Sequence, residues 1–175
     1  MSIEKKLSAE ELKKLSDEEL EEYLESREVY LNFKGKLGAS IDENKRMAIP
    51  TKYRDALGRK FVACHAPGPC LYLFPLQNWK TICNQLNEKC NATPDSQELD
   101  WQRRRLNSNS EDLNFDGKGR FTLPDEMCEH AKLDGEVLII GNMKHLEVWN
   151  PETYKQADET GTFLSHGSMI PYLNY

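Results

Sequence analysis

Two short segments of the sequence carry residue types that can recognise nucleic acid. Each starts with Asp and ends four positions later with Arg, over Asp42–Arg46 and Asp116–Arg120. Arg forms bidentate hydrogen bonds with a guanine edge or a phosphate, whereas Lys adds a less directional charge. Each segment holds both types, so the spacing predicts two loops that face DNA. The predicted DNA-binding residues are Asp42, Lys45, Arg46, Asp116, Lys118 and Arg120.

The same spacing also fits a purely structural role. In each segment the Arg could pair with the Asp and only brace the turn, since charged residues in exposed turns often contact nothing but solvent and each other. Bracing and DNA contact are compatible, and both interpretations stay open. The turn also needs a residue with positive φ, which Gly117 and Gly119 are expected to supply in the second segment. In the first segment Lys45 replaces the later glycine, so Asn44 is expected to take that role, with the turn displaced by one position.

An internal repeat surrounds both segments. The stretch Ser40–Thr51 returns as Asn114–Asp125, 74 positions later, with Asp on Asp, Arg on Arg and Pro on Pro. After each segment the apolar residues alternate, which indicates a β-strand. These alternating residues are Met47 and Ile49 in the first copy, and Phe121 and Leu123 in the second. Each Asp-to-Arg segment is therefore predicted to be the tip of a hairpin.

A short helix and two strands are predicted to follow each tip. The helices start at Thr51 or Asp125 and end near Gly58 or Gly135. Tyr53 and Leu57, or Met127 and Ala131, are expected to face inward. Two apolar strands follow in each copy, with the offset between copies rising to 75 because one connecting turn differs by one residue. The predicted strands span 60–66, 70–74, 136–141 and 145–149.

The segment between the copies has helical periodicity. Apolar residues from Trp79 to Cys90 mark an amphipathic helix, and a second helix is predicted over Glu98–Leu106. Three consecutive arginines, 103–105, point in three directions on a helix, which favours salt bridges and packing over a phosphate-binding stripe. A further helix starts at Pro151, and no structure is predicted from Glu159 onward.

The net charge of −6 over 175 residues does not exclude DNA as a partner. Residues 1–32 alone carry a net charge of −5, which leaves −1 for the rest, and local patches decide binding. Residues 1–32 are expected to form one or two short acidic helices or a partly disordered extension. There is no apolar run of about 18 residues and no signal-peptide pattern, so the expected location is the cytoplasm, without a membrane partner.

Five cysteines are expected to be reduced and mostly buried, because they are odd in number and form no C-x-x-C pair. Cys64, His65 and Cys70 lie close in sequence, but their spacing fits neither a zinc finger nor a Cys/His nucleophile pair. The stretch 117–119 lacks the spacing of a P-loop. We therefore predict no enzyme activity, no cofactor, no metal site and no small-molecule substrate.

Two motifs resemble a known family. The pattern Phe33-Lys-Gly35, five residues, Ile41-Asp42 and then Arg46-x-x-Ile49-Pro50 is similar to the opening of the MraZ family. Residues 133–149, with a Val-Leu-Ile-Ile-Gly run and a His-Leu-Glu-Val-Trp ending, resemble its second half. The resemblance covers residues 33–157.

The resemblance implies a mainly β fold with short helices (α+β). Tandem SpoVT-AbrB-like (AbrB/MazE-like) swapped-hairpin repeats would form one pseudo-symmetric β-barrel-like unit. The repeats would span 36–79 and 112–155, with inter-repeat helices over 80–110 and a tail over 156–175. The resemblance also implies a homo-oligomeric ring that binds repeated double-stranded DNA elements ahead of the division and cell-wall operon, usually as a repressor. By the same resemblance, Asp42, Arg46, Asp116 and Arg120 lie at the DNA-facing edge.

Three features depart from the family pattern. Lys45 stands where the family mostly has Gly, the stretch 106–112 is polar where an apolar run is usual, and residues 1–32 are an addition. The polar stretch predicts a shorter or more exposed strand. The acidic addition keeps an alternative open, a ring-forming protein-interaction module with weak or no DNA binding.

Overall fold

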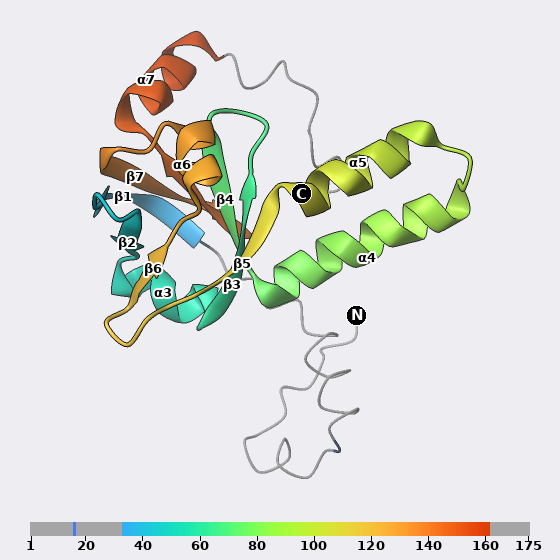
Figure 1. Cartoon of the computed structure of the whole chain (residues 1–175), viewed down its shortest axis with the longest axis horizontal. Helices are drawn as coiled ribbons and strands as arrows, with labels where there is room; N and C mark the ends of the chain where they lie inside the picture. Colours follow the sequence, from blue (N-terminus) through green and yellow to red (C-terminus); the bar gives the residue numbers. More distant parts are fainter. Residues whose placement is uncertain (1–15, 17–32, 162–175) are drawn as a thin grey trace, which may run out of the picture. The chain divides into compact units, whose positions relative to one another are not determined.

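The computed structural model describes residue 16 and residues 33–161. The first half of this range forms two strands, a helix, two strands and two longer helices, and the second half repeats the first five elements before a last helix (Figure 1). The elements are β1 Phe33–Ile41, β2 Arg46–Ala48, α3 Thr51–Leu57, β3 Lys60–His65, β4 Cys70–Pro75, α4 Leu76–Ala92, α5 Gln97–Ser108, β5 Ser110–Asn114, β6 Arg120–Thr122, α6 Asp125–Ala131, β7 Gly135–Met143, β8 His145–Trp149 and α7 Pro151–Thr160.

The strands form one antiparallel sheet of eight, in the order β5-β3-β4-β8-β7-β1-β2-β6. Its two edge strands, β5 and β6, are consecutive in the chain and contact each other. The sheet therefore nearly closes into a barrel, which removes most of the exposed strand edge. The predicted fold class, mainly β with short helices in a barrel-like unit, is confirmed.

The two halves exchange strands within the sheet. β1 pairs with β7 of the second half, and β5 pairs with β3 of the first. The other pairs that join the halves are β2 with β6, where Met47 lies opposite Phe121, and β4 with β8, where Tyr72 lies opposite Glu147. In both pairs a residue meets its own counterpart in the repeat. An approximate two-fold axis therefore passes through the middle of both ladders.

The strand register corrects the predicted offset between the copies. Lys60 pairs with Asn114, and the equivalent pair is Glu136 with Ser40, so the third strands of the halves are 76 positions apart. The offset of 75 holds for β4 and β8. Two changes produce these values. The stretch from the end of α6 to Glu136 is two residues longer than the stretch from α3 to Lys60, and the stretch from Glu136 to Glu147 is one residue shorter than its counterpart.

The side chains that were predicted to face inward form one hydrophobic core. The alternating residues of β2 and β6 and the inward residues of α3 and α6 are all buried. Burial of one Leu, Ile, Met or Phe side chain stabilises the fold by about 1.5–3 kcal/mol relative to leaving it exposed. The confirmed inward residues are Met47, Ile49, Tyr53, Leu57, Phe121, Leu123, Met127 and Ala131.

The ends of the short helices differ in part from the prediction. Thr51 and Asp125 are the first helical residues, and the capping position belongs to the preceding prolines, with no side-chain cap. α3 ends at Leu57 with Gly58 as its C-cap, which agrees with the predicted end near Gly58. α6 ends at Ala131, where Lys132 takes the left-handed conformation with φ of 51°, while Gly135 opens β7.

The inter-repeat helices are longer than predicted. Ile82 and Leu86 of α4 pack on Cys64 and Phe74, whereas α5 has no buried residue. Arg103 and Arg104 pair with Asp100, which confirms the predicted salt bridges. The first residues of the polar stretch 106–112 extend α5 to Ser108, and β5 begins at Ser110. In β5, Leu113 is buried, Ser110 is half-buried and the other residues are exposed.

At the other end, α7 runs two residues into the stretch for which no structure was predicted. The predictions for residues 1–32 lie outside the described residues, apart from position 16. Among the described helices, none is long and apolar enough to cross a membrane.

Candidate nucleic-acid interface

The two Asp-to-Arg loops have the same backbone hydrogen bonds. In the first loop the Asp42 N–H donates to the Arg46 carbonyl at 2.9 Å, and the Lys45 N–H donates to the Asp42 carbonyl at 2.9 Å. In the second loop the same bonds join Asp116 with Arg120 and Gly119 with Asp116, at 2.6 and 3.0 Å. The first turn is therefore not displaced.

The residue just before the Arg takes the left-handed conformation in both loops. Lys45 has φ of 58°, and Gly119 has φ of 73°. The assignments of positive φ to Asn44 and Gly117 were wrong, because the hydrogen bonds that close the turn fix the conformation at the fourth position whatever residue stands there. Lys45 consequently bears a strain of about 1–2 kcal/mol that a glycine would avoid.

Each Asp carboxylate holds its loop together. One oxygen of Asp42 accepts the backbone N–H groups of Asn44 and Arg46, both at 2.9 Å, and the other accepts Nε of Arg46 at 2.9 Å. The hydrogen bond from the Arg46 backbone is the largest cause that lowers the pKa of Asp42, and the Arg46 side chain lowers it further. The carboxylate is therefore charged at neutral pH.

The second carboxylate has the same partners and one more bond. Asp116 accepts the N–H groups of Lys118 and Arg120 at 2.8 and 2.9 Å, and both Nε and Nη2 of Arg120 at 3.1 and 3.0 Å. The hydrogen bond from the Arg120 backbone is again the largest cause that lowers the pKa of Asp116. The predicted bracing pairs are thus present in both loops.

The braced arginines keep donors for a further partner. A guanidinium carries five N–H donors, and the brace uses one of Arg46 and two of Arg120. The side chains are 39% and 35% exposed. Bracing therefore fixes the direction of each arginine while the rest of its fork stays open to a base edge or a phosphate.

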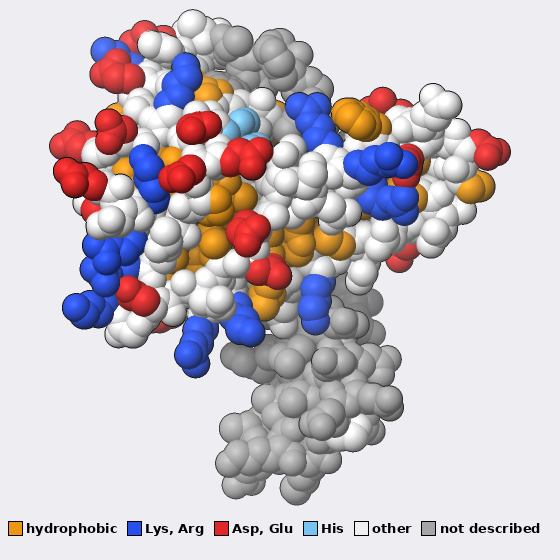
Figure 2. All heavy atoms as spheres, in the orientation of Figure 1, with side chains coloured by type: hydrophobic (Ala, Val, Ile, Leu, Met, Phe, Trp, Pro, Cys, Tyr) orange, Lys and Arg blue, Asp and Glu red, His pale blue; other side chains and the backbone are white. Residues whose placement is uncertain are grey.

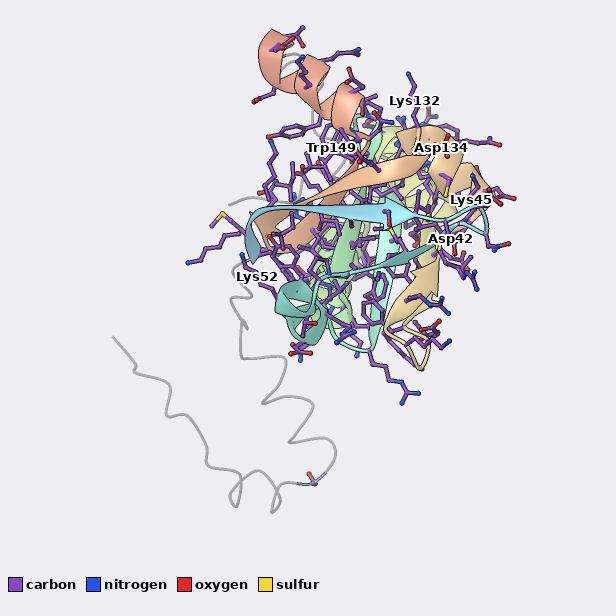
Figure 3. The ribbon with its side chains drawn as sticks, turned by 90° about the vertical axis from the view of Figure 1, so that its left-hand side faces the viewer. Asp42, Lys45, Lys52, Lys132, Asp134 and Trp149 are labelled. Atoms are coloured by element: carbon purple, nitrogen blue, oxygen red, sulfur yellow. The ribbon has the colours of Figure 1, made fainter. Side chains whose placement is uncertain are left out.

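The β2–β6 ladder places both arginines on one outward face. Met47 and Phe121 point into the core, so their neighbours point outward, because side chains alternate along a strand. Arg46 lies opposite Thr122, and Arg120 lies opposite Ala48. The arginines thus flank the two-fold axis, and the loops extend from opposite ends of the ladder, along one edge of the barrel in Figure 1. In Figure 3 Asp42 and Lys45 mark the first loop, well apart from Lys52 on α3.

The helices beside the two loops differ in charge. Arg54 at α3 and Arg59 after it line a hollow with the second loop. The helix near the first loop is α6, which contains Asp125 and Cys128. Burial raises the pKa of the Cys128 thiol, Lys45 of the first loop lowers it, and Asp125 raises it. Neither Arg54 nor Arg59 was among the predicted site residues. The signal for Arg54 was the contrast between Thr-Lys-Tyr-Arg and Asp-Glu-Met-Cys at the starts of the equivalent helices.

The cysteine and histidine candidates have other surroundings. Burial raises the pKa of the Cys64 thiol to about 12, so the thiol is protonated at neutral pH and is a poor nucleophile. The His65 ring stacks on His130, with centroids 4.0 Å apart. Within the described residues no group of three or more potential ligands could hold a metal ion, and all five cysteines are free.

The fold and the loops define a class: a nearly closed barrel of two strand-exchanging halves, each with a braced Asp-to-Arg hairpin. Comparison with known families agrees. A family model described as "MraZ protein, putative antitoxin-like" matches residues 33–102 and 107–164. The chain belongs to the MraZ family.

Several relatives bear the name "Transcriptional regulator MraZ". The protein from Pseudomonas syringae pv. syringae (strain B728a) is 33% identical over 127 residues, which are 70% of this chain and 82% of that protein. The one from Pseudomonas aeruginosa (strain LESB58) is 33% identical over 132 residues, 73% of this chain and 85% of that protein. The one from Pseudomonas putida (strain GB-1) is 34% identical over 128 residues, 70% of this chain and 82% of that protein. These relationships confirm the family and support a role in transcription regulation, which is not an enzyme class.

Proposed function

We propose that this chain is a sequence-specific DNA-binding repressor of the division and cell-wall operon. It would bind repeated promoter elements through the two Asp-to-Arg loops of a ring-shaped oligomer. The observation that carries the proposal is the pair of braced arginines, Arg46 and Arg120, on one outward face of the β2–β6 ladder. The operon, the repeated elements and the ring are what the family resemblance implies.

The outward face of the ladder suits the major groove of DNA. This groove admits a two-stranded β-ribbon. The ladder would present one arginine on each side of the axis, suited to the O6 and N7 atoms of guanine, with Thr122 and Ala48 opposite them, suited to contact with thymine methyl groups. Lys45 and Lys118 in the adjoining loops would contact phosphates.

The Asp brace would also reduce the cost of binding. Ordering a long side chain at an interface costs about 0.5–1.5 kcal/mol. Asp42 and Asp116 hold the arginines before DNA arrives, so part of this cost falls on folding. Asp itself would act as a positioning residue and would touch no base.

Two loops per chain would bind DNA weakly and with little sequence specificity. A ring would raise the number of loops. Several copies that bind several promoter elements at once gain effective concentration, which multiplies the affinity without new contacts. Tight binding would then need several elements close together in the promoter. In this proposal the protein acts in the cytoplasm, associated with the nucleoid.

The test is a mobility-shift titration with the DNA upstream of the protein's own gene. We expect Arg46→Ala/Arg120→Ala to lower the affinity by at least about 25-fold, since each base-reading arginine contributes about 1–3 kcal/mol, or roughly 5- to 150-fold. The matched control is Arg104→Ala, which also removes exposed arginine charge but lies on α5. Unchanged affinity of the double variant would overturn the proposal.

Deletion of residues 1–32 separates this function from the alternative of a protein-interaction ring. If the acidic residues only weaken DNA binding, the shortened chain binds the same DNA more tightly, because ten carboxylates no longer repel the phosphates. If the shortened chain still does not bind DNA, the protein-interaction module becomes the better proposal.

A further inference from the structure

A hollow of about 720 Å³ opens beside the second loop, and residues from both halves of the barrel line it. Arg54 and Arg59 come from α3 and the residues after it, in the first half. Phe115, Lys118 and the loop backbone come from the second half. Neither half could form this hollow alone, because it depends on the strand exchange that brings α3 next to the second loop.

Three basic side chains line the hollow. Within the described residues, none of Arg54, Arg59 and Lys118 forms an ion pair with a carboxylate. The hollow also contains Asp55 and Asp116, but Arg120 already pairs with Asp116. Figure 2 shows the result as a group of Lys and Arg side chains along the edge where α3 and the β5–β6 loop lie.

Gly119 of the second loop and Thr51 of α3 lie next to the Arg54 guanidinium. A side chain at position 119 would overlap the Arg54 guanidinium, so glycine there leaves room for it. Arg54 also donates to Thr51 Oγ1 at 3.4 Å. Beneath the loop, Phe115 packs on Phe61 and Phe121, with ring centroids 5.0 and 5.7 Å apart, which gives the hollow a firm aromatic floor.

We propose that this hollow binds a phosphate group of the DNA backbone, with Arg54 and Arg59 as phosphate-binding residues beside Lys118. The proposal rests on the proposed DNA-binding function and deepens it. Phosphate contacts position a protein on the duplex, whereas contacts to base edges specify the sequence. Arg54 would therefore fix the register at which Arg120 reads a base.

The helix beside the first loop has no basic residue at the position of Arg54. In the repeat, Cys128 stands at the position of Arg54 and Glu129 at the position of Asp55. Two acidic residues, Asp125 and Glu126, open the neighbouring helix. The phosphate site would thus occur once per chain, at the second loop.

The first arm of the experiment uses inorganic phosphate and the ¹⁵N-labelled full chain. We expect phosphate to shift the amide signals of Gly117 and Gly119 in the natural protein, and Arg54→Gln to abolish these shifts. The matched control is Lys52→Gln, which removes the same charge from the same helix outside the hollow. Arg54→Lys keeps the charge and should keep part of the shift. Thermal unfolding verifies that each variant is folded.

The second arm measures affinity for a duplex at about 50 and about 200 mM salt. One phosphate contact fewer changes the slope of log affinity against log salt by about 0.9. The loss of affinity across this salt range should therefore shrink about 3.5-fold in Arg54→Gln, for promoter and unrelated sequences alike, and stay unchanged in Lys52→Gln.

Each outcome separates this inference from the proposed function. If the natural protein binds DNA but Arg54→Gln behaves as Lys52→Gln does, the phosphate site is overturned and the function stands. If phosphate shifts the loop signals but the DNA affinity and its salt dependence do not change in Arg54→Gln, the hollow binds a free phosphate and the assignment to the DNA backbone is wrong. If the natural protein binds no DNA, the function fails, and the first arm alone decides whether the hollow binds phosphate.

Discussion

The two halves of the barrel share their backbone and differ in what surrounds their loops. Both loops have the same turn, the same Asp brace and an outward Arg on the β2–β6 ladder. The second loop lies on an aromatic floor beside Arg54 and Arg59. At the first loop, Ile41 stands at the position of Phe115, and the helix near this loop starts with two acidic residues. Acidic side chains gather over that helix, α6, in Figure 2.

This difference distinguishes the residues that the barrel needs in order to close from the residues that a bound ligand would need. The buried ladder residues and the braces appear in both halves, because each half must close the same barrel. The basic surroundings appear in one half only, so closing the barrel does not require them. We infer that the second loop makes the stronger DNA contact and that the first adds a weaker one.

Single arginine substitutions test this ranking and have the largest expected effect. Arg120→Ala should lower DNA affinity towards the upper end of the range of about 5- to 150-fold, and Arg46→Ala towards the lower end. Fluorescence anisotropy with a single promoter element measures both. An equal or larger loss in Arg46→Ala would remove the ranking of the loops while leaving DNA binding intact.

Exchanging the fourth loop residue between the halves has a smaller effect. Lys45→Gly should relieve about 1–2 kcal/mol of left-handed strain and cost about 0.5–1 kcal/mol in chain entropy, so the free energy of unfolding rises by about 0.5–1 kcal/mol. DNA binding should weaken, because a charge is lost. Urea denaturation and anisotropy measure the two effects.

The reverse exchange should act in the opposite direction on stability. Gly119→Lys places a side chain at φ of 73°, where it also meets the Arg54 guanidinium, so the free energy of unfolding should fall by about 1–2 kcal/mol. If Lys45→Gly lowers stability instead, Lys45 makes a stabilising contact that outweighs its strain.

The sequence predicted the parts of the fold that local patterns determine. Alternating residues such as Met47 and Phe121 gave strands with the correct inward face, and the repeat gave equivalent hairpins. The exchange of strands between the halves came from the family resemblance, because periodicity does not say which strands pair. The offset in β7 was missed for a related reason: only the register shows where two residues enter a loop.

The candidate site was predicted in its residues but only partly in its geometry. The Asp and Arg positions followed from their spacing. The left-handed residue did not, because residue preference favours Asn44 whereas the closing hydrogen bonds of the turn select Lys45. Arg54 was missed because its neighbour, Gly119, is 65 positions away and belongs to the other half.

Acid should loosen both braces, with the smallest expected effect. The pKa of each Asp is lowered from 3.8, chiefly by the backbone hydrogen bond from its Arg. Each carboxylate therefore stabilises its loop above pH 3.8, and this contribution is lost as the pH falls through the lowered pKa. We expect no change in the loops between pH 7 and pH 5, and a change below about pH 4.

The order in which the braces open would sharpen the comparison of the loops. Arg120 donates two side-chain hydrogen bonds to its Asp, whereas Arg46 donates one, so the second brace should persist to a lower pH. Amide signals of Arg46 and Arg120 during an acid titration measure this order. Asp116→Asn is the control, because its amide oxygen can still accept N–H groups but does not titrate, so the Arg120 signal should lose its transition. If the two loops open together in the natural protein, the extra bond of Arg120 contributes nothing, and any difference between the loops must come from Arg54 and Arg59.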